Sequence, residues 1–198
     1  TPLMNAVRNS SNTCSVPIVY MMLKAGVDVN AQETNGWNAM MLAARYCRVA
    51  GSEEVLRALI QAKADVNMTE IGGWSALMHA ARYCNTDSTL GAVRLLLDAG
   101  ANVNATNTQK WTSLMHAARY SGTDSHETAV KWLLEAGAQV NLKDSGGWCA
   151  MMHAARYAGR ESTPGTVAMI LDAGGDVNST NNDGWSALLH AARYSRHE

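Results

Sequence analysis

The stretch GWSALMHAARY occupies residues 73–83, and close variants of it recur along the chain. A tryptophan stands at the same place in each copy, and consecutive copies lie 37 residues apart without one slip. A fixed period of this kind is typical of repeat proteins, whose units bury their apolar faces against one another. The stretch is therefore interpreted first as part of a structural repeat. Its tryptophans are Trp37, Trp74, Trp111, Trp148 and Trp185.

The chain divides after each of these tryptophans into five full units and a partial sixth of 13 residues. We predict that the units form a single array over residues 1–198. The first unit opens directly on a helix start and the last stops after one helix. We therefore expect a cropped array with apolar surface at both ends. The units are 1–37, 38–74, 75–111, 112–148, 149–185 and the partial 186–198.

Each unit is predicted to contain two helices and an extended turn. In the unit 75–111, Ser75 is placed to cap the first helix. Gly100 stands where a left-handed cap ends the second helix, and a polar segment then leads to the next tryptophan. The residues predicted to face the core are Leu77, Met78, Ala80 and Ala81 in the first helix and Val93, Leu96 and Leu97 in the second.

Two later units carry start signals for their second helices. Asp124, followed three residues later by Glu127, predicts a capping box. Thr163-Pro164 predicts a cap with proline at the first helical position.

The unit openings and endings resemble the ankyrin repeat over essentially the whole chain. Thr1-Pro2-Leu3 matches the TPLH opening of that family, and endings such as LLLDAGANVN at 95–104 match its second half. The resemblance implies an all-α fold. The expected architecture is an ankyrin-repeat solenoid of stacked helix-loop-helix units joined by extended β-turn segments.

The chain departs from the family pattern in length and in one motif residue. Its period is 37 residues, against roughly 33 in the family, and the extra residues are expected in the loops 47–52, 84–88 and 121–125. Removing four residues from one such loop is expected to leave the fold intact, because loop entropy changes slowly with length. The motif histidine is replaced, so its hydrogen bonds are expected to give way to flexible packing. The replacing residues are Met4, Met41, Met78, Met115, Met152 and Leu189.

Composition limits the classes of function. The chain has 198 residues, 47% of them hydrophobic, and a net charge of −1, which argues against non-specific polyanion binding. No apolar run is long enough to cross a bilayer, and no signal peptide opens the chain. The four cysteines form no CxxC pair and are interpreted as reduced, which predicts an intracellular, cytoplasmic protein. They are Cys14, Cys47, Cys84 and Cys149.

The sequence offers little support for enzyme chemistry or a metal. The histidines His79, His116, His153 and His190 recur with the same period, but stacked helices lie too far apart for a shared zinc. They are interpreted as packing residues. Cys149 lies four residues before His153, as a nucleophile and base would, but no other unit repeats the pair. No catalytic residue, metal or cofactor is predicted.

The remaining candidates are the tryptophans and the Arg-Tyr pairs that end each first helix. In ankyrin repeats, target contacts come from the inter-repeat turn and the exposed side of the first helix. The turn positions carried over are Thr108, Gln109, Ser145 and Gly146. The helix positions, with the five tryptophans, form what we call the Trp-Arg-Tyr row: Arg45, Tyr46, Arg82, Tyr83, Arg119, Tyr120, Arg156, Tyr157, Arg193 and Tyr194.

Two interpretations of this row compete. Tryptophan, tyrosine and arginine dominate interface hot spots, so the row is a candidate binding surface for a protein partner. Alternatively, each tryptophan stacks on arginine or tyrosine and serves packing. The leading hypothesis is a non-enzymatic protein-binding scaffold with a concave groove. Single-stranded nucleic-acid binding by aromatic stacking and a spacer role in a larger protein are the alternatives.

Overall fold

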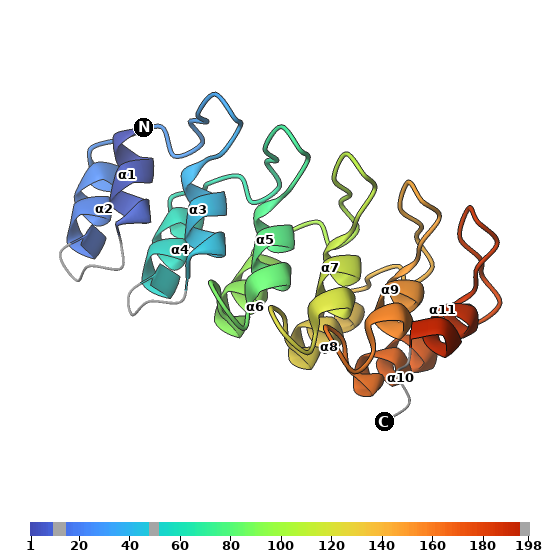
Figure 1. Ribbon diagram of the computed structural model, residues 1–198. Helices are drawn as coiled ribbons and strands as arrows, with labels where there is room; N and C mark the ends of the chain where they lie inside the picture. Colours follow the sequence, from blue (N-terminus) through green and yellow to red (C-terminus); the bar gives the residue numbers. More distant parts are fainter. Residues whose placement is uncertain (10–14, 48–51, 195–198) are drawn as a thin grey trace. The chain divides into compact units, whose positions relative to one another are not determined.

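The computed structural model describes residues 1–9, 15–47 and 52–194, and within them the secondary structure consists of eleven α-helices joined by turns (Figure 1). The residues fall into two compact units, Thr1–Asn102 and Val103–Glu198. Each unit is described by itself. The boundary between them falls inside the repeat 75–111, so the single array remains a proposal.

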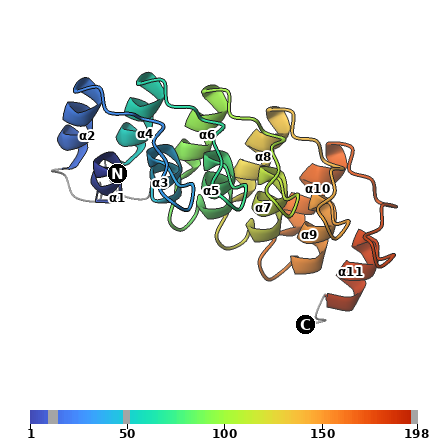
Figure 2. The ribbon, with the colours of Figure 1, turned by 90° about the horizontal axis from the view of Figure 1, so that it is seen from above.

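The first unit contains three helical pairs. Figure 2 shows α1, α3 and α5 in one row, with α2, α4 and α6 in a second row beside it. Helix α3 packs against α1, α4 and α5, and α4 packs against α2 and α6. The helices are α1 (Pro2–Arg8), α2 (Ser15–Lys24), α3 (Ala39–Arg45), α4 (Ser52–Gln61), α5 (Ala76–Tyr83) and α6 (Leu90–Asp98).

The second unit repeats this arrangement with five helices. Helix α9 packs against α7, α10 and α11, and α10 also contacts α8. In Figure 2 the rows are α7, α9 and α11, and α8 and α10. The helices are α7 (Ser113–Tyr120), α8 (Glu127–Glu135), α9 (Ala150–Tyr157), α10 (Pro164–Asp172) and α11 (Ala187–Tyr194).

The first helix of a repeat is short and buried on most of its sides. In α5, six consecutive residues from Ala76 to Ala81 are buried, because the small alanines allow other helices to approach closely. Ser75 caps this helix by accepting a hydrogen bond from the backbone N–H of Met78 at 3.3 Å, as predicted. The motif methionines Met4, Met41, Met78, Met115 and Met152 are all buried. Leu189 in α11 is exposed.

The second helices confirm one predicted start and correct the other. Helix α10 begins at Pro164 with Thr163 as its cap, as the sequence predicts. The capping box from Asp124 to Glu127 is wrong, because α8 begins at Glu127 and its cap is His126. His126 Nδ1 accepts a hydrogen bond from the backbone N–H of Thr128 at 3.1 Å. The His126 imidazole thus caps the helix in place of the predicted Asp124 carboxylate.

The extra residues lie between the helices of a repeat, as predicted for 84–88 and 121–125. Residues 48–51 of the loop 47–52 lie outside the described residues. These loops are bonded to their neighbours: the Ser88 hydroxyl donates to Ala44 O at 2.5 Å, and Gly122 N donates to Glu161 O at 2.9 Å. Deleting four loop residues therefore removes inter-repeat hydrogen bonds as well as chain length. The change in loop entropy alone thus does not determine the loss of stability.

The asparagine of a Val-Asn ending links one inter-repeat turn to the next by hydrogen bonds. Asn141 Oδ1 accepts from Asp176 N at 2.9 Å, and its Nδ2 donates to Gly174 O at 3.1 Å. Asn104 makes the same two contacts with Gln139 and Gly137. One amide side chain thereby connects each turn to the next. The corresponding residues in the first unit are Asn30 and Asn67.

The terminal helix presents apolar side chains to solvent. Leu188 of α11 is 76% exposed, and it borders an apolar pocket with Met151, Val167 and Leu171. Leu188 and Leu189 of α11 are thus open to solvent. None of the helices in the described ranges is both long and apolar enough to cross a membrane.

Asn141→Ala is expected to lower the free energy of unfolding by about 1 to 2 kcal/mol, because it removes two inter-repeat hydrogen bonds. The matched control is Asn178→Ala, since the Asn178 side chain makes neither of these contacts to a following turn. Urea unfolding of both variants measures the difference. Equal costs would show that the bonds add nothing beyond the local turn.

Candidate functional site

The tryptophans stack on histidines. In the second unit the ring centroid of Trp111 lies 4.8 Å from that of His116 in the same helical pair and 4.1 Å from that of His153 in the next. Trp148 likewise lies 5.2 Å from His153 and 4.1 Å from His190. Each of these indoles is therefore held between two imidazoles, at distances typical of stabilising aromatic pairs. We call this arrangement the Trp-His stack.

The first unit contains the same arrangement. His79 lies between Trp37 and Trp74, with ring centroids 4.5 and 5.0 Å away. The position of His79 is occupied by Leu42 in the preceding repeat, so the position accepts an apolar side chain. The histidines are buried and the tryptophans half-buried. An indole separates one imidazole from the next, which supports the interpretation of the histidines as packing residues.

Sequence reasoning missed histidine as the partner of tryptophan. It weighed arginine and tyrosine, although each histidine follows a tryptophan by five residues in every unit that contains it. A tryptophan just before a helix cap and a histidine one turn into that helix face the same side. That shared period was the available signal.

The arginines join the tryptophans to the tyrosines of the following repeat. The Arg119 guanidinium carbon lies 6.0 Å from the Trp111 ring centroid and 4.0 Å from that of Tyr157, and Arg119 forms an ion pair with Glu161 at 3.2 Å. Arg156 lies 5.2 Å from the Trp148 centroid and 4.4 Å from that of Tyr194. The predicted cation–π contacts are therefore present alongside the Trp-His stack.

Other members of the row follow the same pattern. Arg45 lies 3.4 Å from the Tyr83 centroid and forms an ion pair with Asp87. Arg82 contacts Tyr83, and Arg119 also contacts Tyr120, in each case its neighbour in the chain. Exposed Arg193 lies over Trp185, itself stacked on His190. These members of the row contact one another across repeats, and the row's use as a binding surface remains a proposal.

The turn positions carried over from the family are mostly open to solvent. Thr108, Gln109 and Ser145 are exposed, and Gly146 is half-buried. Their backbones are bonded between repeats, since Ser145 N donates to Gln109 O at 2.9 Å. The side chains of Gln109 and Ser145 are thus presented on a fixed backbone.

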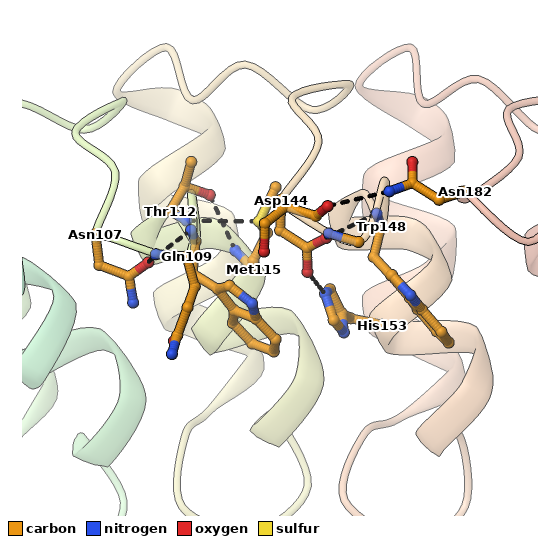
Figure 3. Close-up of polar contacts among 11 residues, drawn as sticks. Asn107, Gln109, Thr112, Met115, Asp144, Trp148, His153 and Asn182 are labelled. Atoms are coloured by element: carbon orange, nitrogen blue, oxygen red, sulfur yellow. Dashed lines mark hydrogen bonds and ion pairs between the residues drawn. The ribbon is translucent and has the colours of Figure 1, made fainter. Parts of the chain in front are cut away.

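Beneath one turn lies a buried polar pair. Asp144 Oδ1 accepts from the backbone N–H groups of Gly146 and Trp148, both at 2.9 Å, and its Oδ2 lies 3.0 Å from His153 Nε2 (Figure 3). Both side chains are 5% exposed. Asp144 thus lies in the turn before Trp148 with its carboxylate pointing into the repeat.

The protonation states of this pair follow from its surroundings. Burial alone would raise the pKa of Asp144, but hydrogen bonds from His153 and from two backbone N–H groups outweigh it and lower that pKa. Burial lowers the pKa of His153, and it outweighs the carboxylate, which acts in the opposite direction. Asp144 is therefore ionised and accepts the Nε2–H of a neutral imidazole. The hydrogen bond to Asp144 fixes the orientation of the His153 ring, and Trp148 stacks on that ring.

The residues of the candidate nucleophile–base pair, Cys149 and His153, lie at this site. Cys149 is buried and makes no side-chain cap bond, and His153 Nε2 is hydrogen-bonded to Asp144. Within residues 1–9, 15–47 and 52–194, no cluster of three or more potential metal ligands is present. Cys47, Cys84 and Cys149 are buried and not in disulfide bonds, whereas Cys14 lies outside the described residues.

Trp111→Ala is expected to lower the free energy of unfolding by about 1 to 2.5 kcal/mol. This is less than the about 3 to 5 kcal/mol for a fully buried aromatic, because one edge of the indole is open. Arg119→Ala is expected to be partly non-additive with it, since the Arg119 guanidinium carbon lies 6.0 Å from the Trp111 ring centroid. Lys131→Ala, on an exposed face of α8, is the additive control. Chemical unfolding of the single and double variants measures the coupling, and full additivity for Arg119 would contradict the stacking.

His79 makes stability depend on pH. Burial, with a smaller effect of Arg45, lowers the pKa of His79 from 6.5 to about 3. Between these values the unfolded chain binds a proton that the folded chain does not, so stability falls as pH falls, by about 1.4 kcal/mol per pH unit. His79→Leu, which copies Leu42 of the preceding repeat, is expected to flatten that slope between pH 6 and pH 4, as measured by urea unfolding. An unchanged slope would show that His79 protonates freely in the folded state.

Comparison with known proteins gives one family. A family model of ankyrin repeats (three copies) matches residues 1–70, 50–144, 88–163 and 124–198. The crystal structure of an ankyrin repeat domain from Acinetobacter baumannii AYE is similar to the chain, with a TM-score of 0.81 and 28% sequence identity over 98% of this chain and 91% of that chain. No curated protein sequence matches the chain.

Proposed function

This chain belongs to the ankyrin repeat family, and we propose that it acts as a non-enzymatic scaffold that binds a protein partner. Ankyrin repeats generally mediate protein–protein interaction. The proposed binding surface combines the exposed turn residues with the accessible edges of the Trp-Arg-Tyr row. The proposed array spans all six units of the chain.

The observation that carries this proposal is a rigid, periodic display of side chains suited to interfaces. The tryptophans are half-buried, so each has a supported face and an accessible edge. Backbone bonds between turns and the paired arginines fix the surrounding groups. A surface that is ordered before binding loses little conformational entropy when a partner docks. Such preorganised aromatic and guanidinium groups are the groups that dominate binding energy at interfaces.

Two observations favour a protein over single-stranded nucleic acid. Arg45 and Arg119 are already paired with Asp87 and Glu161, so their charge is partly neutralised. The net charge of the chain is −1, and phosphate binding requires a basic stripe. Any nucleic-acid binding would show a steep dependence on salt, whereas capture of a protein by aromatic contacts would not.

We further propose an intracellular location. Cys47, Cys84 and Cys149 support it, because they are buried and not in disulfide bonds, and reduced buried cysteines are typical of reducing compartments. Burial raises the pKa of Cys47 to about 12, so this thiol is a packing residue and a poor nucleophile.

Charged substitutions at the turn tips test the proposed binding surface. The double variant Gln109→Arg with Ser145→Arg is expected to abolish partner capture, while its unfolding free energy stays within about 0.5 kcal/mol of the original, as for ordinary surface changes. The matched control is Ala168→Arg, an exposed position on α10 in the other row of helices. Affinity capture with quantitative mass spectrometry compares the three proteins. A partner retained by the turn variant would place the binding surface elsewhere.

A further inference from the structure

A pocket of about 290 Å³ lies between α4 and α6, two neighbouring helices of the second row in the first unit (Figure 2). Each of the two helices belongs to a complete helical pair, α3 with α4 and α5 with α6. The volume is at the lower end of the range for small-ligand sites. Half-buried aliphatic side chains form the floor of the pocket, and exposed charged and amide groups form its rim. The lining residues are Arg57, Ile60, Gln61, Leu95, Asp98 and Ala99.

The basic residue of α4 lacks the acidic partner that its counterparts have. Arg94 of α6 forms an ion pair with Asp98, four residues later, at 3.1 Å. Lys131, at the same position of α8, pairs with the acid four residues after it at 3.9 Å. In α4 the residue four positions after Arg57 is Gln61, and Arg57 forms no ion pair with any residue of the described part of the chain. The uncompensated charge at the pocket is therefore positive.

Two further side chains of this repeat add to the imbalance of charge. Glu53, one helical turn before Arg57, accepts a hydrogen bond from the Thr89 hydroxyl at 2.5 Å, so its carboxylate is already bonded to the cap of α6. Lys63 follows the end of α4 at the position of Gly100 in the next repeat, and it has a φ of 63°. A lysine adopts this conformation only at a cost. The end of α4 thus has two cations, whereas at the end of α6 a cation is paired with an acid.

We propose that this pocket binds the carboxyl-terminal residue of a peptide whose last side chain is aliphatic. The Arg57 guanidinium binds the terminal carboxylate through charge-assisted hydrogen bonds. The Gln61 amide, four residues later on the same helix face, donates a further hydrogen bond to it. The aliphatic side chain of the peptide lies on Ile60 and Leu95, which removes apolar surface from water.

Two features of the pocket favour a peptide end over other carboxylates. Its apolar floor consists of three half-buried side chains, which would leave most of a long acyl tail in water. A free amino acid would bring its ammonium group close to the Arg57 cation, whereas the same nitrogen in a peptide is a neutral amide. The pocket lies on the second row of helices and takes no part in the proposed turn and Trp-Arg-Tyr surface, so the inference does not rest on that surface.

Titration with N-acetyl-leucine tests the pocket with a probe that carries both proposed groups. The readout is the pair of Leu95 methyl NMR signals, identified by their loss in Leu95→Met. We expect a saturable shift with a dissociation constant in about the millimolar range. Neither N-acetyl-leucinamide, which lacks the charge, nor acetate, which lacks the side chain, is expected to produce a comparable shift. A shift that is absent, non-saturable or equal for the acid and the amide would overturn the proposal, and tighter binding of free leucine would overturn the assignment to a peptide end.

Two variants of α4 test the role of the unpaired cation. Arg57→Gln is expected to weaken binding of N-acetyl-leucine about threefold or more, because it removes the cation from the pocket. Gln61→Glu restores the acid that the other helices have at this position, so it is expected to pair with Arg57 and weaken binding as well. The matched control is Arg160→Gln, the same change at an exposed loop position of the second unit. Thermal unfolding checks that all three variants remain folded, and unchanged binding by either α4 variant would overturn the proposal.

Discussion

The fold rests on one constraint: each helical pair has apolar faces that only the neighbouring pairs cover. Helix α9 shows this, because it buries six consecutive residues and packs against α7 and α11 as well as its partner α10. Helix α11 has the same sequence pattern but buries only Ala187 and His190. The difference between the two helices is therefore one of neighbours, and stability in such a chain is a sum of interface contributions between adjacent repeats.

A strict period converts this constraint into stacks of identical contacts. Once the spacing is 37 residues, any side chain that reaches the next repeat meets the same environment each time. This explains why the asparagine amides, the arginines and the indoles each form a regular series across repeats. Two lysines show that the backbone conformation is kept even where the residue changes. Lys63 and Lys110 have positive φ angles at positions where the other repeats have glycine. The backbone is therefore strained at these two residues, and the repeats keep their register.

The repeats, the helical pairs and the family could be predicted from the sequence, because they depend on local patterns that recur. The cap at Ser75 and the start at Pro164 were predictable for the same reason. The start of α8 was not predictable in this way. Asp124 is the more usual cap residue, but the helix begins after His126, whose imidazole accepts the capping hydrogen bond.

The residues of the candidate site could be predicted from the sequence, but the contacts between them could be predicted less well. The Trp-Arg-Tyr row was found by period alone, but which ring lies against which depends on the rise from one repeat to the next. That distance cannot be obtained from spacing along the chain. The burial of Asp144 is a case in point, since the exposed and buried acids of the turns look alike in sequence. Only its hydrogen bonds to Gly146, Trp148 and His153 distinguish it.

The same side chains both hold the repeats together and form the proposed binding surface, and this overlap constrains how the surface can vary. An indole pinned between two imidazoles has its orientation set by packing, so a partner meets a fixed edge. Changing that residue for specificity would cost stability in two interfaces at once. The exposed turn positions carry no such penalty: Gln109 and Ser145 support the stack only through their backbones. Specificity is therefore expected to reside in the turns, and affinity in the aromatic edges beneath them.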